Sequence, residues 1–379
     1  MALHDGRHPV KPLAGLTVLD FTRVYSGPYA TLLLSDLGAR VIKVEHPVHG
    51  DDSRSFGPFA GERSTYFETL NRGKQSIAVD LRTAEGQRLL RSLATQCDVV
   101  IENFRPGVLA RYGLGYATLS REHPALVYAS LSGFGADSSR GCYDIVAQAE
   151  SGLMAATGLP DLPLKAAPPV GDAVHGLTGA VGVLAALWQA ARAGRGAHVE
   201  VAMVEALFAV LENTLAAYTL TGEVPRLRAN QDGVLAPFDC FQTADGWVVI
   251  AVGNDALWQP FAALIDPGLA RDPRFASNEG RVANYPALRP RVAAWCAALP
   301  SGDLLDRLHA AGIPAGAVRA SDELAVDPRL EARSMLVDLG DAVFVPGSPL
   351  RLNGQPVTVA DRAPRLGEHT AAVIEAFAV

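Results

Sequence analysis

The fold is decided by the stretch from Leu16-Thr17-Val18-Leu19-Asp20-Phe21 to Arg40-Val41-Ile42-Lys43-Val44-Glu45, two segments rich in apolar and β-branched residues. Between them, a Gly27-Pro28 turn precedes helical spacing over Tyr29–Leu37, which stops at Gly38. The order strand, helix, strand indicates a βαβ unit. Such units pair their strands in parallel through a right-handed crossover.

The same alternation continues along the chain and predicts an α/β fold with a doubly wound, mainly parallel sheet. Further strands are expected at Ser76–Leu81, Asp98–Phe104, Leu126–Leu131 and Ala197–Met203. Further helices are expected at Thr83–Thr95, at Tyr143–Ala156, from Asp172 through the apolar run Leu177–Ala191, and at Val204–Thr221.

A chain of 379 residues is longer than one hydrophobic core usually grows, so we expect two domains. The character changes after Thr221, and two strand patterns flanking Thr243-Ala244-Asp245-Gly246 indicate a hairpin. We expect a large domain at 1–224 and a small α+β domain at 225–320. The pattern alone does not decide whether the last segment, which ends in an amphipathic helix at Glu368–Phe377, returns to the large domain.

The composition is that of an ordinary globular protein, with 49% apolar and 19% charged residues. The formal net charge of −7 argues against a nucleic-acid partner, because no basic tract balances it. An anionic ligand is still compatible with this charge, since it needs only a local basic cluster.

No segment of the sequence predicts a secretory signal or a membrane span. Met1–His8 is polar and charged, and the apolar run Leu177–Trp188 is shorter than the roughly 20 residues needed to cross a bilayer. The four cysteines are scattered without metal-ligand spacing, which predicts reduced thiols, no metal site and a cytoplasmic location. They are Cys97, Cys142, Cys240 and Cys296.

Two common enzyme classes lack their motifs here. The first strand-to-helix turn, Arg23-Val24-Tyr25-Ser26-Gly27-Pro28, has one glycine where a dinucleotide-binding turn needs three. No G-x-S-x-G nucleophile elbow occurs either, which argues against a serine hydrolase.

Asp172 lies in Pro168-Pro169-Val170-Gly171-Asp172-Ala173-Val174-His175-Gly176, directly before the longest apolar helix pattern. One interpretation is an N-cap, in which the carboxylate accepts backbone N–H bonds. The other is a catalytic carboxylate, which free N–H groups and the helix dipole would hold ionised and nucleophilic. His175 is either an acid–base partner or a partly buried polar residue.

Basic residues occur in two turns. Asn71-Arg72-Gly73-Lys74 precedes a strand, and Glu102-Asn103-Phe104-Arg105-Pro106-Gly107 ends one, with Arg111 about one helical turn further on. The second turn is expected at the carboxyl end of a parallel strand, where open α/β sheets bind ligands. These cations can hold phosphates, or they can be solvated surface charges.

Taken together, these motifs resemble the class III CoA-transferases, the group of formyl-CoA:oxalate CoA-transferase, the carnitine CoA-transferases and the related α-methylacyl-CoA racemase. The resemblance runs from Leu13 to Thr370. Its landmarks are Asp36-Leu37-Gly38-Ala39-Arg40-Val41-Ile42-Lys43-Val44-Glu45, Asn71-Arg72-Gly73-Lys74, Glu102-Asn103-Phe104-Arg105-Pro106-Gly107, Gly171-Asp172 and Gly194-Arg195-Gly196.

The resemblance implies that Asp172 is the catalytic residue and that CoA thioesters are substrates, with no permanently bound cofactor. It implies a two-domain chain whose C-terminal segment rejoins the large domain, which then comprises 1–224 plus 321–379. It also implies an interlocked, ring-like homodimer. The residues it assigns to CoA binding, together with the basic turn, are Val24, Tyr25, Ser26, Arg72, Lys74, Asn103, Phe104, Arg111 and Tyr143.

The sequence departs from these relatives at several positions. His46 replaces a basic residue that helps to hold CoA in formyl-CoA transferase, and Gly141 stands where that enzyme has a lysine. No glycine-rich loop corresponds to its active-site cover near Arg228–Leu235, which argues against oxalate as the acid. Tyr143 replaces a catalytic histidine of the racemase, which removes one of the two bases that α-proton exchange needs.

The expected function is therefore transfer of CoA from an acyl-CoA donor, such as succinyl-CoA, to a small carboxylic acid through an aspartyl anhydride and an aspartyl-CoA thioester. The alternatives are an α-methylacyl-CoA racemase or epimerase and a non-catalytic acyl-CoA-binding protein. Arg72 or Arg226 is a candidate partner for the second carboxylate of a dicarboxylic acid.

Overall fold

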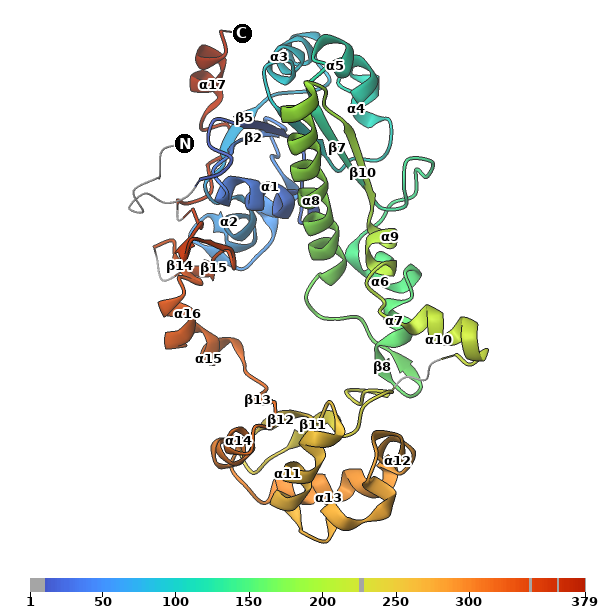
Figure 1. Cartoon of the computed structure of the whole chain (residues 1–379). Helices are drawn as coiled ribbons and strands as arrows, with labels where there is room; N and C mark the ends of the chain where they lie inside the picture. The colour runs from blue at the N-terminus through green and yellow to red at the C-terminus, as the bar shows by residue number, and fades with distance from the viewer. Residues whose placement is uncertain (1–10, 225–227, 341–342, 360, 379) are drawn as a thin grey trace. The chain divides into compact units, whose positions relative to one another are not determined.

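A computed structural model describes residues 11–224, 228–340, 343–359 and 361–378 (Figure 1). The chain forms two compact units. The first holds Met1–Met154, Lys165–Glu223 and Ala325–Val379, and the second holds Ala155–Leu164 and Val224–Leu324.

The first unit is built on a six-stranded parallel sheet in the order β10-β7-β6-β1-β2-β5. A large parallel sheet in an α/β fold was expected from the alternation of strand and helix patterns. The strands are β1 (Thr17–Asp20), β2 (Arg40–Glu45), β5 (Gln75–Ala78), β6 (Val99–Glu102), β7 (Val127–Ser132) and β10 (His198–Ala202).

Helices cover both faces of this sheet, because its strands are apolar on both sides. Apolar side chains of α1 (Ser26–Asp36) and α8 (Val170–Ala193) form one core with β1, β6 and β7. Leucines of α3 (Ala84–Ala94) and α5 (Tyr116–Glu122) form the other, with Val373 of α17 (Thr370–Ala376). The end of the chain thus packs in the first unit.

Two predicted helices are interrupted. The pattern at 143–156 is two helices, α6 (Asp144–Glu150) and α7 (Leu153–Ala156), with Gly152 between them at φ 94°. The pattern at 204–221 is also two, α9 (Met203–Phe208) and α10 (Thr214–Thr221). The helical spacing of apolar residues continues across both breaks, so the sequence pattern predicted one helix in each place.

α8 is the one helix among the described residues that is long and apolar enough, by length and composition, to cross a membrane. It contacts α1, α9, β7 and β10 in the first unit. Gly194 ends it in the left-handed conformation at φ 64°, which glycine adopts without steric cost.

The remaining elements of the first unit are short. They are the 3₁₀ turn η1 (Asp52–Ser55), α2 (Thr65–Asn71), α4 (Val108–Arg111), α16 (Pro328–Ala332) and the strands β3 (Phe59–Ala60), β4 (Arg63–Ser64), β14 (Leu336–Asp338), β15 (Phe344–Pro346), β16 (Arg351–Leu352) and β17 (Gln355–Pro356). The short helix α15 (Ser321–Ala325) lies at the end of the second unit, which runs to Leu324.

The second unit contains the predicted hairpin, with a third strand beside it, around a core of its own. Its elements are β8 (Gly158–Leu159), β9 (Leu162–Pro163), β11 (Phe238–Gln242), β12 (Trp247–Ala251), α11 (Asp255–Ile265), the 3₁₀ turns η2 (Leu269–Arg271) and η3 (Pro273–Phe275), α12 (Asn278–Ala283), α13 (Tyr285–Ala297), α14 (Ser301–Ala310) and β13 (Ala315–Ala317). The β8–β9 hairpin differs from the sequence prediction, which placed 155–164 in the large domain.

Candidate active site

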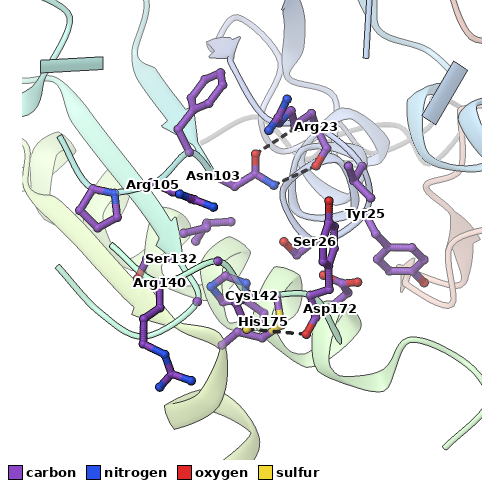
Figure 2. Close-up of a pocket in the computed structure, with 18 of the residues that line it drawn as sticks. Arg23, Tyr25, Ser26, Asn103, Arg105, Ser132, Arg140, Cys142, Asp172 and His175 are labelled. Carbon is purple, nitrogen blue, oxygen red and sulfur yellow. Dashed lines mark hydrogen bonds between the residues drawn. The ribbon is translucent and has the colours of Figure 1, made fainter. Parts of the chain in front are cut away.

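A pocket of about 180 Å³ opens in the first unit where β1, β6 and β7 end (Figure 2). The chain leaves β1 and β6 toward opposite sides of the sheet, since β1 lies between β2 and β6. Open α/β sheets bind ligands at such a reversal of strand order. We call this cavity the Asp172 pocket. Its lining is Arg23–Ser26, Asp52, Asn103–Pro106, Leu131–Gly133, Arg140–Tyr143, Asp172, His175 and Met203.

Close packing of α8 on α1 brings Asp172 to this pocket. A Cβ on Gly176 would lie 2.4 Å from the backbone oxygen of Ser26, at the start of α1. Only glycine therefore allows the two helices to approach this closely. The approach places the first turn of α8 beside the loop that follows β1.

Asp172 is not the N-cap of α8. The cap position is Pro169, and Asp172 is the third helical residue. The backbone N–H groups of Gly171 and Asp172 instead donate to Oδ1 of Asp144, at 2.7 and 3.4 Å. Asp144 is held in turn by Gln148, whose Nε2 donates to Oδ2 at 2.7 Å. A carboxylate from α6 thus caps α8 and leaves the Asp172 side chain for another role.

Burial, followed by the negative charge of Asp144, raises the pKa of Asp172 to about 7. Among the described residues, none donates a hydrogen bond to its carboxylate. The sequence expectation that helix N–H groups would hold Asp172 ionised was therefore wrong in direction, because Asp144 occupies those groups. A carboxylate that is poorly solvated and free of hydrogen bonds is a stronger nucleophile when ionised.

His175 follows one turn later on α8 and is 1% exposed. Its Nε2 lies 3.1 Å from the backbone oxygen of Val201, and burial lowers its pKa to about 4. The ring is therefore neutral at pH 7, with its proton on Nε2. Its Nδ1 has no hydrogen-bond partner among the described residues.

The loop after β1 forms the opposite wall. Val24 has φ 68°, a left-handed conformation that β-branched residues rarely adopt and that is often found at functional sites. Asn103 fixes the neighbouring residue, because its Oδ1 accepts from the N–H of Arg23 at 2.9 Å and its Nδ2 donates to the oxygen of Arg23 at 2.8 Å.

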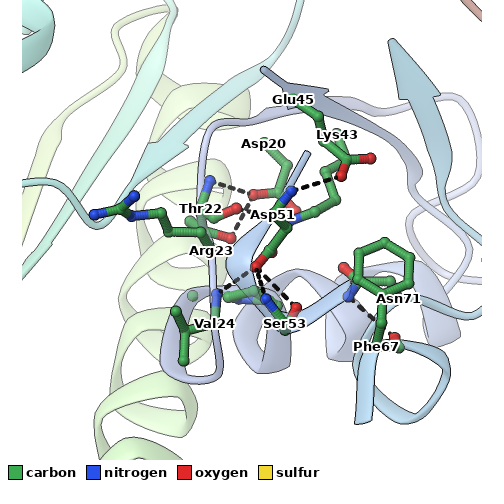
Figure 3. A network of polar contacts seen from close by, with 12 residues as sticks. Asp20, Thr22, Arg23, Val24, Lys43, Glu45, Asp51, Ser53, Phe67 and Asn71 are labelled. Carbon is green, nitrogen blue, oxygen red and sulfur yellow. Dashed lines mark hydrogen bonds and ion pairs between the residues drawn. The ribbon is translucent and has the colours of Figure 1, made fainter. Parts of the chain in front are cut away.

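A buried polar network holds this loop in place (Figure 3). Asp51 Oδ1 accepts from the N–H of Val24 at 3.1 Å, and Asp51 Oδ2 forms a 2.8 Å ion pair with Lys43. Lys43 Nζ also donates to the oxygen of Thr22 at 2.7 Å. Although burial opposes it, the charge of Lys43 lowers the pKa of Asp51 to about 2. The pair is therefore ionised and acts as a rigid support.

The structure brings most of the predicted site residues together. Those that line the Asp172 pocket are Val24, Tyr25, Ser26, Asn103, Phe104, Tyr143 and Asp172. Arg111 lies exposed at the end of α4, outside this lining. Its role in CoA binding stays a prediction.

The structure contradicts the prediction that Arg72 and Lys74 bind a ligand. Arg72 is 1% exposed and forms a bidentate pair with Asp36, at 2.5 and 2.8 Å. Lys74 is 3% exposed and donates to Thr31 Oγ1 and Asn71 Oδ1 at 2.7 and 2.9 Å. Both side chains therefore bind groups inside the protein: Arg72 binds the carboxylate of Asp36, and Lys74 binds the hydroxyl of Thr31 and the amide oxygen of Asn71. Arg226 lies outside the described residues.

A second pocket, of about 280 Å³, adjoins the first at Arg23 and Phe104, which line both. We call it the adjacent pocket. It contains Arg82, which the sequence reasoning missed, and whose Nη2 lies 3.0 Å from Nε2 of His46. A signal was present, since Arg82 closely follows a predicted strand, as Arg105 does.

The sequence from residue 13 to 370 matches the family model for CoA-transferase family III. The chain belongs to this family. Its relatives are named as CoA-transferases, so the protein is an enzyme and the reading as a non-catalytic binding protein is wrong.

Three relatives illustrate the similarity. The acetyl-CoA:oxalate CoA-transferase of Acetobacter aceti is 40% identical, over 98% of this chain and 97% of the relative. The succinate–glutarate CoA-transferase of Agrobacterium fabrum is 38% identical over 96% and 95%. A CAIB/BAIF family crystal structure from Brucella suis is 38% identical, with a TM-score of 0.86 over 97% and 99% of the two chains.

The described residues contain no cluster of three His, Cys, Asp or Glu side chains that could hold a metal ion.

Proposed function

We propose that this enzyme transfers CoA from an acyl-CoA to a short dicarboxylic acid, with Asp172 as the covalent nucleophile. The observation that carries the proposal is the state of Asp172: its carboxylate lines the pocket at the carboxyl ends of the strands, and no described residue donates a hydrogen bond to it. A carboxylate held only for structure would be expected to cap its helix, a role that Asp144 fills instead.

The reaction is a sequence of four attacks. An oxygen of Asp172 attacks the thioester carbon of the donor, the C–S bond breaks, and a mixed anhydride and the CoA thiolate form. The thiolate attacks the aspartyl carbon of the anhydride and releases the donor acid, which leaves an aspartyl-CoA thioester. The acceptor carboxylate then expels the thiolate from this thioester, and the thiolate attacks the acceptor carbon of the new anhydride. Asp172 is regenerated, with no net proton transfer.

The two pockets provide a path for CoA. The adjacent pocket accommodates the nucleotide end, where the exposed guanidinium of Arg82, which also pairs with Asp80 at 2.9 Å, can contact phosphate oxygens. The pantetheine arm passes Arg23 and Phe104, which line both pockets, and reaches Asp172.

The protein also has donors for the tetrahedral oxyanion. N–H groups in the first turn of α8 donate to Asp144, so the backbone N–H groups at Ser132 and Gly133, which line the pocket, are the candidates. Burial and the neighbouring Tyr29 and Asp172 raise the pKa of Tyr25 to about 12, which keeps its hydroxyl protonated as a further donor.

Related enzymes support a dicarboxylic acid as substrate. The relatives from Acetobacter, Agrobacterium and Haloarcula hispanica are named for oxalate, glutarate and mesaconate, each of which has two carboxylates. Because the Acetobacter relative is named for oxalate, the sequence argument against oxalate is weakened, and we keep oxalate among the candidate acceptors. Succinyl-CoA, named for the Haloarcula enzyme, is the first donor to test beside acetyl-CoA.

Racemisation remains the alternative chemistry on the same pocket. It needs two bases flanking the α-carbon. If Asp172 is one of them, the candidates for the other in this pocket are Tyr143 and the neutral His175. Incubation of an α-methylacyl-CoA in deuterium oxide distinguishes the two, because only a racemase introduces deuterium at the α-carbon.

We also propose a homodimer in the cytoplasm. The outer face of α8 supports an interface, since Val181 and Trp188 are 65% and 66% exposed and large apolar residues favour burial. The four cysteines are unpaired, as is usual in a reducing compartment. Light scattering of the purified protein and fractionation of cells test the two proposals.

The test of the function is transfer itself. Acetyl-CoA or succinyl-CoA is incubated with oxalate, succinate, glutarate or mesaconate, and the new thioesters are separated by chromatography. We expect a new acyl-CoA with at least one diacid, and none with the Asp172→Ala variant. Equal turnover by this variant would refute the nucleophile, and no transfer by the native enzyme to any acid would refute the activity.

A further inference from the structure

Three arginines line the Asp172 pocket, and two of them already have anionic partners. Nη1 of Arg23 lies 3.3 Å from Oδ2 of Asp52, and Nη1 of Arg140 donates to Oε2 of Glu150 at 3.0 Å. Arg140 also stacks over the ring of Phe134, 4.1 Å from its centre. Both charges are thus compensated within the protein.

Arg105 is the exception. Among the described residues its exposed side chain has neither a hydrogen-bond nor an ion-pair partner, although it lines the pocket and directly follows Phe104. Figure 2 shows its guanidinium directed into the space between the end of β6 and Asp172, whereas that of Arg140 points away. Its positive charge is therefore available to a ligand in the pocket.

Gly141, in the loop between β7 and α6, leaves room for this side chain. A Cβ on Gly141 would lie 3.1 Å from Nη2 of Arg105, which is tighter than an ordinary contact. The absence of a side chain at 141 therefore leaves space for the guanidinium of Arg105.

We infer that Arg105 binds the remote carboxylate of a dicarboxylic substrate while its other carboxylate exchanges at Asp172. The inference rests on the proposed function and names the residue that selects diacids. A guanidinium matches a carboxylate with two parallel N–H bonds, and such a contact is lost with a monoacid.

The position of Arg105 favours a carboxylate over the phosphates of CoA. Arg105 lines the Asp172 pocket but not the adjacent pocket, where Arg82 lies. The thioester must reach Asp172, so the phosphates lie a whole pantetheine arm away from it. The anion close to the reacting carbon is the far end of the acyl group.

The experiment uses acetyl-CoA as donor, since acetate has no second carboxylate. The acceptors are succinate and butyrate, which have the same number of carbons, and butyrate is measured as a competitive inhibitor if its transfer is slow. The variants are Arg105→Gln and Arg105→Lys. Arg121→Gln is the matched control, because Arg121 is exposed on α5 and lines neither pocket.

We expect Arg105→Gln to raise the KM for succinate on the order of 10- to 100-fold, as for loss of a charged hydrogen-bonded pair. The kcat should change little, because the remote ion pair is the same in the ground and transition states. The constants for butyrate and the KM for acetyl-CoA should stay within about twofold, and Arg105→Lys should lie between native and Gln.

Other outcomes overturn the inference. An equal loss with succinate and butyrate makes Arg105 a general structural residue, and a raised KM for acetyl-CoA alone assigns it to the CoA phosphates. Both leave the proposed function intact. Absence of transfer by the native enzyme to all acids refutes the proposed function itself, and the inference falls with it.

Discussion

Replacing Asp172 by Asn should make the protein more stable at alkaline pH while abolishing transfer. Burial raises the pKa of Asp172 from 3.8 to about 7, so the folded protein holds this proton more tightly than the unfolded chain does. Ionisation of Asp172 therefore opposes folding. The loss of stability begins as the pH rises through the pKa of this carboxyl group in the unfolded chain, near 4, and is complete above the folded pKa of about 7. Asn is similar in shape and never ionises, so the variant escapes this loss.

The shift sets the size of the effect. About three pKa units at about 1.4 kcal/mol each give a ceiling of about 4 kcal/mol at pH 8, which falls to about 2 kcal/mol at pH 5. Solvent that reaches the partly exposed carboxylate reduces both values, so a gain of about 1–3 kcal/mol at pH 8 is expected. No described residue donates a hydrogen bond to the carboxylate, so the substitution removes none.

The assay is urea unfolding of the native protein and of Asp172→Asn at pH 5 and pH 8. Asp137→Asn is the control, because Asp137 is exposed, and surface substitutions usually change stability by less than about 0.5 kcal/mol. A gain for Asp172→Asn that is larger at pH 8 supports the reasoning. A variant that is less stable than the native protein at pH 8 would refute it, since Asp172 would then be an ionised structural residue.

Three further predictions concern the same site. With the pKa of Asp172 at about 7, the carboxylate fraction should rise about tenfold from pH 6 to pH 8, and the rate of single-turnover acyl transfer should rise with it. Asp144→Asn should shift this pH–rate profile to lower pH, because it removes a negative charge that raises the pKa of Asp172. An unshifted profile would count against that coupling. Gly176→Val should strongly reduce transfer and lower stability by about 1–3 kcal/mol in urea unfolding, because its Cβ would meet backbone 2.4 Å away, and full activity would show that the close approach of α8 is not needed. Lys43→Met should cost about 3–5 kcal/mol by leaving a buried carboxylate unpaired, and a native melting temperature would contradict a structural role for this pair.

Local patterns were sufficient for the sheet, because parallel strands buried on both faces give apolar runs that alternate with helices. The strand at Arg40–Glu45 matches β2 at both ends. α8 starts at Val170, two residues before Asp172, which the sequence placed at the mouth of this helix. The helix breaks near Gly152 and after Phe208 were invisible because apolar spacing continues across them.

The errors at the site arose from partners far away in the sequence. Asn71-Arg72-Gly73-Lys74 has the residue types of a phosphate-binding turn, and nothing local shows that Arg72 pairs with Asp36 inside the core. Likewise, the cap on α8 comes from Asp144, 27 residues before Gly171, so the freedom of the Asp172 carboxylate became evident only in three dimensions.

The central claim is that Asp172 carries the acyl group and then CoA. The most direct measurement is trapping with hydroxylamine during incubation with an acyl-CoA donor, followed by mass spectrometry of the peptides. Hydroxylamine converts an aspartyl anhydride or thioester to a hydroxamate, and the account predicts this modification on Asp172 and its dependence on the donor. A hydroxamate on another residue, or on none while transfer proceeds, would contradict it.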